Sequence, residues 1–257
     1  MATDLAPVPA VAADRPADDL GLDRDFVRML ARLPFIALGM ILAAWLGQQF
    51  SPLVPVVMLC VGMILAAVID GIAFKVPNWL TLSMILAGWG FGVLNSFGVT
   101  IGPGPIEAAF RSDFPASGGI SASLLGTLVA FGLLFPVFLI GGMGQGDVKM
   151  QAGFGAWVAA LYGSNEGLWT IVYAICAGYI VGGILAFGMM MLRGQVHRNL
   201  SNIREIIRDL RVLVTMGPGA AHQRAHQRRA TWHRLPYGIP LCIGFVGTII
   251  YLHWVNS

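Results

Sequence analysis

The chain has 257 residues, of which 56% are hydrophobic and only 11% are charged, and its formal net charge is +3. Because soluble domains carry about 25% charged residues, this composition excludes an ordinary soluble domain and predicts a polytopic membrane protein. The three cysteines, Cys60, Cys176 and Cys242, stand singly in apolar runs without a CxxC pair, so neither a zinc site nor a disulfide framework is predicted.

Residues 1–32 are rich in alanine, proline and aspartate and are predicted to be a disordered tail, without the short apolar region of a cleaved signal peptide. Apolar runs near the ~20 residues that a bilayer requires then predict an all-α membrane protein, a bundle of about seven transmembrane helices (six to eight). The core is expected at 33–192 and the last helix within 236–257. The expected spans are 33–50, 53–74, 79–100, 120–142, 149–163, 167–192 and 236–255.

The fifth expected span is short, and it is expected to be tilted, to continue from Asp147 or to lie in a thinned bilayer. Lysine and arginine are concentrated in alternate loops, before the first span, after the second, after the fourth and after the sixth. The positive-inside rule therefore places the N-terminus in the cytoplasm and the C-terminus outside. The same count places Asp70 and Asp147 on one side, the cytoplasmic one.

The longest basic loop, 193–235, begins with apolar residues at helical intervals separated by arginines, which predicts an amphipathic helix at the membrane interface. Its arginines favour attraction to anionic lipid, with docking of a partner protein as the alternative. Since topology accounts for the arginines, nucleic-acid binding is not predicted. His222, His226 and His233 lack nearby carboxylates or cysteines, so metal binding is not predicted there.

Two aspartates stand at the ends of apolar runs, where a carboxylate is costly and is therefore a candidate functional residue. Asp70 ends the run VVMLCVGMILAAVID, and Pro77, which cannot continue a helix, marks the turn that follows. Asn78 is expected to cap the next helix, beginning near Trp79. Taken alone, Asp70 has the alternative role of an aspartate that merely ends a helix.

Asp147 lies in the glycine-rich segment GGMGQGDVKM. Gly144 and Gly146 leave the backbone bare and able to adopt positive φ, so that a substrate strand lies close to the main chain. The alternative is a flexible loop with an aspartate that caps a helix.

Together the two aspartates predict an acid–base pair that needs neither a metal nor a cofactor. A water held between them attacks a peptide carbonyl when one carboxyl is protonated and the other ionised. Close like charges separate the two pKa values of such a pair. Asp147 is expected to precede a helix, whose dipole favours an anion, so Asp147 is the predicted base and Asp70 the predicted acid.

These segments resemble the type IV prepilin peptidases, which are membrane aspartyl proteases of the GxGD class. The first motif of that family is an aspartate, five residues and Ile-Pro-Asn; here Asp70 is followed by five residues and Val76-Pro77-Asn78. The second is GxGD, a variable residue, lysine and an apolar residue, matched by residues 144–150 (GQGDVKM). A Pro-aromatic-Gly turn before the last span matches residues 236–238, and the resemblance covers residues 53–190 and 236–255.

The resemblance implies an endopeptidase of the bacterial inner membrane, which removes a short basic leader from prepilin or pseudopilin precursors at the cytoplasmic face. Asp70 and Asp147 would be catalytic. The predicted substrate-binding residues flank them, and they are Pro77, Asn78, Gly144, Gly146 and Lys149. For Lys149, the alternative is a lysine that extends to the membrane interface.

Larger members carry paired CxxC motifs and also N-methylate the new terminus. Those cysteines are absent here, so the chain resembles the shorter form associated with tight-adherence pili, and methylation is not expected. The resemblance specifies neither the pilin nor the oligomeric state. Three other functions stay open: a proton-coupled transporter with the aspartates as relay groups, an inactive assembly scaffold, and presenilin-like cleavage of other substrates.

Overall fold

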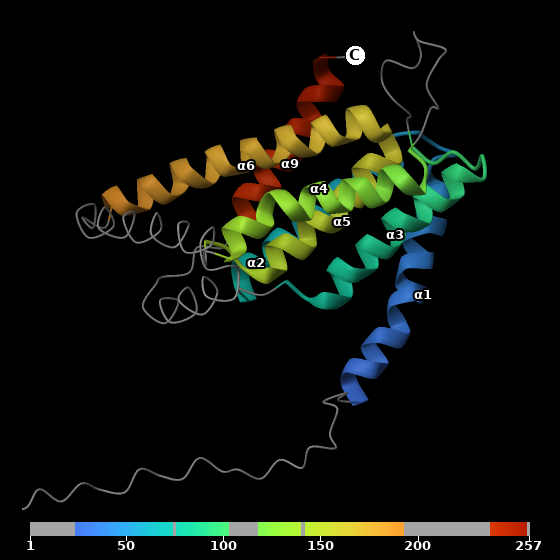
Figure 1. The fold of residues 1–257 in the computed structure, drawn as a ribbon, viewed down its shortest axis with the longest axis horizontal. Coiled ribbons are helices and arrows are strands. Elements are labelled where there is room, and N and C mark those ends of the chain that lie inside the picture. The colour runs from blue at the N-terminus through green and yellow to red at the C-terminus, as the bar shows by residue number, and fades with distance from the viewer. Residues whose placement is uncertain (1–23, 74–75, 103–117, 140–141, 193–236, 256–257) are drawn as a thin grey trace, which may run out of the picture.

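The structure is a computed structural model that describes residues 24–73, 76–102, 118–139, 142–192 and 237–255. Within these ranges the chain forms seven helices and no strands (Figure 1), which confirms the predicted all-helical fold. Helices suit this apolar chain because a helix satisfies its backbone hydrogen bonds within one segment. They are α1 (Arg24–Gly47), α2 (Val54–Ala73), α3 (Asn78–Ser96), α4 (Ile120–Leu139), α5 (Gln145–Tyr162), α6 (Ser164–Leu192) and α9 (Gly238–Val255).

Helices α1, α5 and α6 begin several residues earlier than the sequence predicts, α6 at Ser164 rather than at residue 167. Helix α1 begins at Arg24, so the prediction of a disordered tail is wrong for residues 24–32. Arginine, leucine, methionine and alanine favour helix, and their mixture here continues the helix beyond the apolar span. Helix α5 begins at Gln145 rather than near residue 149, and so includes Asp147. Residues 1–23 and the predicted basic loop 193–235 lie outside the described residues.

Six of the described helices are long and apolar enough to cross a membrane. The remaining one, α5, is instead the central helix of the bundle: from Asp147 to Tyr162 nearly every side chain is buried. It packs mainly against α4 and α3, and also against α6. The apolar surfaces of the outer helices are exposed, as expected for helices that face lipid. The protein is therefore embedded in a membrane, with one enclosed helix at its centre.

Small residues allow α4 and α5 to cross at close range. A Cβ atom at either Gly126 or Gly155 would collide with the carbonyl oxygen of the other. Beside this crossing, the Ser123 hydroxyl lies 2.9 Å from the carbonyl oxygen of Gly88 and 3.0 Å from that of Ala156. Ser123 therefore joins α4 to α3 and α5 through backbone carbonyls, the kind of polar contact that stabilises helix pairs in lipid.

Helix α3 is joined to α5 by further hydrogen bonds. The indole N–H of Trp157 donates to the carbonyl of Met84 at 2.8 Å, and this tryptophan is fully buried. At the end of α3, the Asn95 side-chain amide donates to the carbonyl of Ala160 at 2.8 Å and to that of Gly118 at 3.2 Å. These bonds hold α3 against the central helix at its middle and at its C-terminal end.

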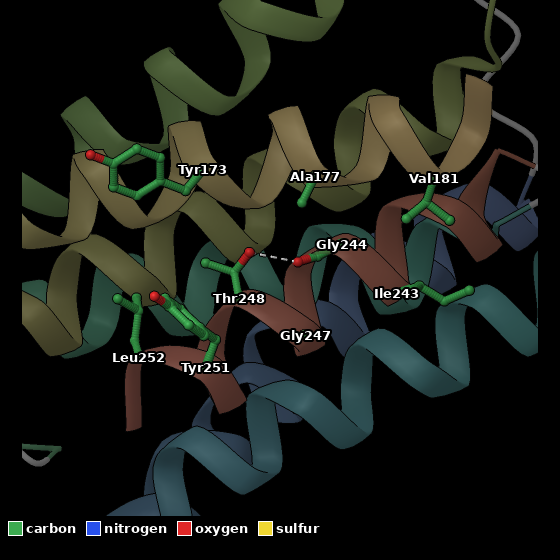
Figure 2. Close-up of a pocket in the computed structure, with 9 residues that line it drawn as sticks. All are labelled: Tyr173, Ala177, Val181, Ile243, Gly244, Gly247, Thr248, Tyr251 and Leu252. Atoms are coloured by element: carbon green, nitrogen blue, oxygen red, sulfur yellow. Dashed lines mark hydrogen bonds between the residues drawn. The ribbon is translucent and has the colours of Figure 1, made fainter. Parts of the chain in front are cut away.

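Helices α6 and α9 form a second close pair, in which Gly244 lies against the backbone of Gly178. Figure 2 shows an apolar groove between these two helices, where the Thr248 hydroxyl donates to the carbonyl of Gly244 at 2.7 Å. None of the predicted site residues lines this groove. Its lining residues are Tyr173, Ala177, Val181, Ile243, Gly244, Gly247, Thr248, Tyr251 and Leu252.

Candidate active site

One end of the bundle brings together the last turn of α2 and the first turns of α3, α5 and α9. Helix α2 packs chiefly against α9, and the first backbone N–H of α9 reaches Asp70 near the end of α2. At the same end, Gly146 of α5 lies against Val76, just before α3. Asp70 and Asp147 therefore lie at the same end of the structure, although 77 positions (147 minus 70) separate them in the sequence.

Asp70 is buried, with only 7% of its surface exposed. Its Oδ2 accepts a hydrogen bond of 3.2 Å from the backbone N–H of Gly238. A Cβ atom at Gly238 would lie 2.9 Å from that same oxygen, which is closer than Cβ atoms approach other heavy atoms in real structures. The carboxylate thus occupies the space that any other side chain at position 238 would need, which explains a glycine at the start of α9.

Asp147 is buried still further, with 4% of its surface exposed. It lies in the first turn of α5, and its Oδ2 accepts a hydrogen bond of 3.2 Å from the backbone N–H of Gly144, the residue that caps the helix. This is the carboxylate half of a capping box, and glycine has no side chain with which to return the bond. Its other oxygen, Oδ1, has no hydrogen-bond partner among the described residues.

The glycines around Asp147 serve close packing rather than an unusual backbone. Gly144 has an extended conformation with φ of −78°, which any residue can adopt. Among the described residues, positive φ occurs at Gly98, Gly102 and Gly163, and so at neither glycine of the GxGD segment. The freedom of these two glycines to adopt positive φ is therefore not used in the structure. Gly146 packs closely, since a Cβ there would lie 3.2 Å from the Cβ of Val76, tighter than most such contacts.

Both carboxylates are buried at this end of the bundle, one on α2 and one on α5, and these two helices contact each other. Two acidic groups enclosed in this way cannot both ionise without a large cost, so they are suited to share one proton. The described residues contain no cluster of three or more His, Cys, Asp or Glu side chains.

The structure also places the other predicted site residues near the aspartates. Asn78 does not cap α3 as expected: Pro77 is the cap residue, with extended backbone, and no side chain bonds to the helix end. Instead, the side-chain oxygen Oδ1 of Asn78 accepts a hydrogen bond of 3.3 Å from the ammonium of Lys149. The side chain that was expected to cap its own helix therefore bonds to α5.

One contributor was missing from the predicted site, the backbone of Gly238. Gly238 acts through its backbone N–H, and a backbone donor has no side chain by which a sequence pattern could reveal it. The available signal was the Pro-aromatic-Gly turn at residues 236–238. It predicts the start of a helix, but it does not say that this start lies against Asp70.

Residues 57–187, which are 131 of the 257 positions, match the type IV leader peptidase family. The chain belongs to this family. Both aspartates of this leader peptidase lie inside the matched range, whereas Gly238 lies beyond it. No curated protein and no solved structure matches the chain. The family makes the protein a peptidase, and its buried carboxyl pair is the candidate for the catalytic groups.

Proposed function

We propose that this leader peptidase is an aspartyl endopeptidase whose catalytic pair is Asp70 and Asp147. The observation that carries the proposal is that two buried carboxylates, from helices α2 and α5 that contact each other, lie at the same end of the bundle. Structural carboxylates in lipid-embedded helices are rare and costly. Two that meet are better explained by shared acid–base chemistry than by helix termination.

The proposed reaction is hydrolysis of a peptide bond by a water held between the two carboxyl groups. The ionised carboxylate takes a proton from the water as its oxygen attacks the carbonyl carbon, and the protonated carboxyl donates to the carbonyl oxygen. The proton taken from water is then delivered to the amide nitrogen, a hydroxyl of the tetrahedral intermediate returns its proton to the other carboxylate, and the C–N bond breaks to release a carboxylic acid and an amine. Asp147 Oδ1, buried and without a partner in the described part of the chain, is an acceptor for this water.

Two effects oppose each other at Asp147, so neither aspartate is assigned as the base. Its place in the first turn of α5 favours an anion through the helix dipole, as the sequence argument assumed. However, an ionised carboxylate with a buried, unpaired oxygen is costly. Hydrogen bonding also does not distinguish the base from the acid, since Asp70 and Asp147 each accept one hydrogen bond of 3.2 Å from a backbone N–H.

The proposed substrates are prepilin or pseudopilin precursors, cut at the cytoplasmic edge of their apolar helix in the bacterial inner membrane. Pro77, Gly144 and Gly146 surround the aspartates at the helix ends and are proposed to contact the bound chain. The arginine distribution supports a cytoplasmic location for this end. In this orientation the N-terminus is cytoplasmic and the C-terminus periplasmic.

The test is co-expression of the full chain with a candidate prepilin, followed by mass spectrometry of the mature N-terminus. We expect one cut between the basic leader and the apolar helix, and no cut with Asp70→Asn or Asp147→Asn. Turnover retained by either variant would refute the pair. Proton movement in vesicles without any cleavage would instead favour the relay transporter, which the family assignment does not support.

A further inference from the structure

The two motif segments are joined to each other by a hydrogen bond that does not involve either aspartate. Lys149 Nζ, on α5, donates to Asn78 Oδ1, the first residue of α3, at 3.3 Å. An ammonium group can only donate, so the oxygen of the Asn78 amide must face it. The bond links positions 71 residues apart, at the end of the bundle where the carboxylates meet.

A second contact lies one turn earlier on the same face of α5. Gly146 precedes Lys149 by three positions, so the two point to the same side of the helix. A Cβ at Gly146 would lie 3.2 Å from Val76 Cβ and 3.3 Å from the Val76 backbone nitrogen. Residues 76–78 therefore rest on the first turns of α5 at two successive points, one apolar and one polar.

We propose that Asn78 and Lys149 are positioning residues, whose mutual bond fixes the start of α3 on α5 and thereby the approach of Asp70 to Asp147. Only residues 71–77 connect Asp70 to Asn78, while Lys149 stands two positions after Asp147. Each of the two bonded residues therefore lies close in the sequence to one of the two aspartates. This inference rests on the proposed function, and it replaces substrate binding as the role of both side chains.

The chain offers a matched control at the other end of the same helix pair. Asn95, in the last turn of α3, also holds α5 by a side-chain amide, donating to the carbonyl of Ala160 at 2.8 Å. It lies far along the helix from Asn78 and touches neither motif. Removal of either amide costs one contact between α3 and α5, and removal of Asn95 also costs its bonds to Gly118 and Ile101. Only the loss of Asn78 is expected to change the relative position of the two carboxylates.

The experiment measures kcat and KM of the purified full chain in detergent, with a peptide carrying a leader and the start of the apolar helix. We expect Asn78→Ala and Lys149→Met each to lower kcat about tenfold to a hundredfold with KM little changed, the range of one hydrogen bond to a charged group. Asn78→Asp keeps an acceptor and retains most of the turnover. Asn95→Ala keeps kcat, although its unfolding temperature falls.

The double variant separates a bond between the two side chains from independent roles. If they act through each other, Asn78→Ala combined with Lys149→Met is no slower than the worse single variant. Additive losses would overturn the inference. So would a Lys149→Met effect on KM alone that disappears when the acidic residues of the peptide are replaced by amides, since that result marks a lysine that binds substrate.

Failure of the proposed function gives a different result from failure of this inference. If the wild-type chain cuts no leader peptide, the catalytic proposal fails while the bond itself can still be tested. The same four proteins, wild type, two single variants and the double variant, then give a coupling in unfolding temperature. If that coupling is absent, the inference that Asn78 and Lys149 act through their mutual bond is wrong, whether or not the protein cleaves the peptide.

Discussion

Replacement of Gly238 by alanine is the sharpest test of how Asp70 is held. The new methyl carbon would lie 2.9 Å from Asp70 Oδ2, 3.1 Å from its Cβ and 3.2 Å from its Cγ, all inside normal contact distance. Either the carboxylate or the start of α9 must move, and the 3.2 Å hydrogen bond from the backbone N–H is lost. A hydrogen bond to a charged group contributes about 1.5–3 kcal/mol, so kcat/KM should fall about tenfold to 150-fold.

The assay is leader-peptide cleavage, measured beside the unfolding temperature of each protein. Alanine in place of glycine restricts the unfolded chain, so Gly238→Ala should not be strongly destabilised. The matched control is Gly247→Ala on the same helix, where an added Cβ meets nothing within 4 Å. Full turnover by Gly238→Ala would show that the position of the Asp70 carboxylate is not set by the start of α9, and the account of the site would be wrong.

Further predictions concern the carboxyl pair and the packing around α5. Asp70→Asn and Asp147→Asn should each reduce cleavage below detection while the protein stays folded, as judged by its elution and its unfolding temperature. Trp157→Phe removes the 2.8 Å bond to the backbone of α3 and should destabilise the protein by about 1–3 kcal/mol, measured by denaturant titration in detergent. Gly155→Leu should prevent folding, because a Cβ there already collides with α4, whereas Gly132→Leu, with open space around it, should fold normally; equal yields of the two would contradict the crossing.

The sequence predicted the helices well because lipid requires long apolar segments with internally bonded backbones. Its errors lie at helix starts that are not apolar. Residues 24–32 contain charges, and the segment before Asp147 contains glycines, so hydropathy assigned both to regions outside a helix. In the structure residues 24–32 and 145–148 are helical, whereas Gly144 keeps an extended backbone. The helix hydrogen-bond ladder continues into polar residues when they remain good helix formers or are packed against neighbours.

The candidate site was predictable where chemistry is visible in a side chain. Asp70 and Asp147 stand out because acids are rare beside apolar runs. The partner of Asp70 could not be predicted, since Gly238 contributes only a backbone N–H and the absence of a Cβ. Asn78 was misassigned because local spacing favours a helix cap, whereas the side chain bonds to Lys149, 71 positions away. Long-range partners of this kind follow from packing and not from local pattern.

The enclosure of α5 has a consequence for biosynthesis. A nascent segment partitions into the bilayer according to its own apolarity, and charged residues oppose that step. Helix α5 carries Asp147 and Lys149 and is not among the six described helices apolar enough to cross alone. It must therefore enter lipid together with its more apolar neighbours, which shield it. The backbone N–H that donates to Asp70 belongs to α9, the last of the described helices, so the surroundings of the two carboxylates are complete only after α9 has been inserted.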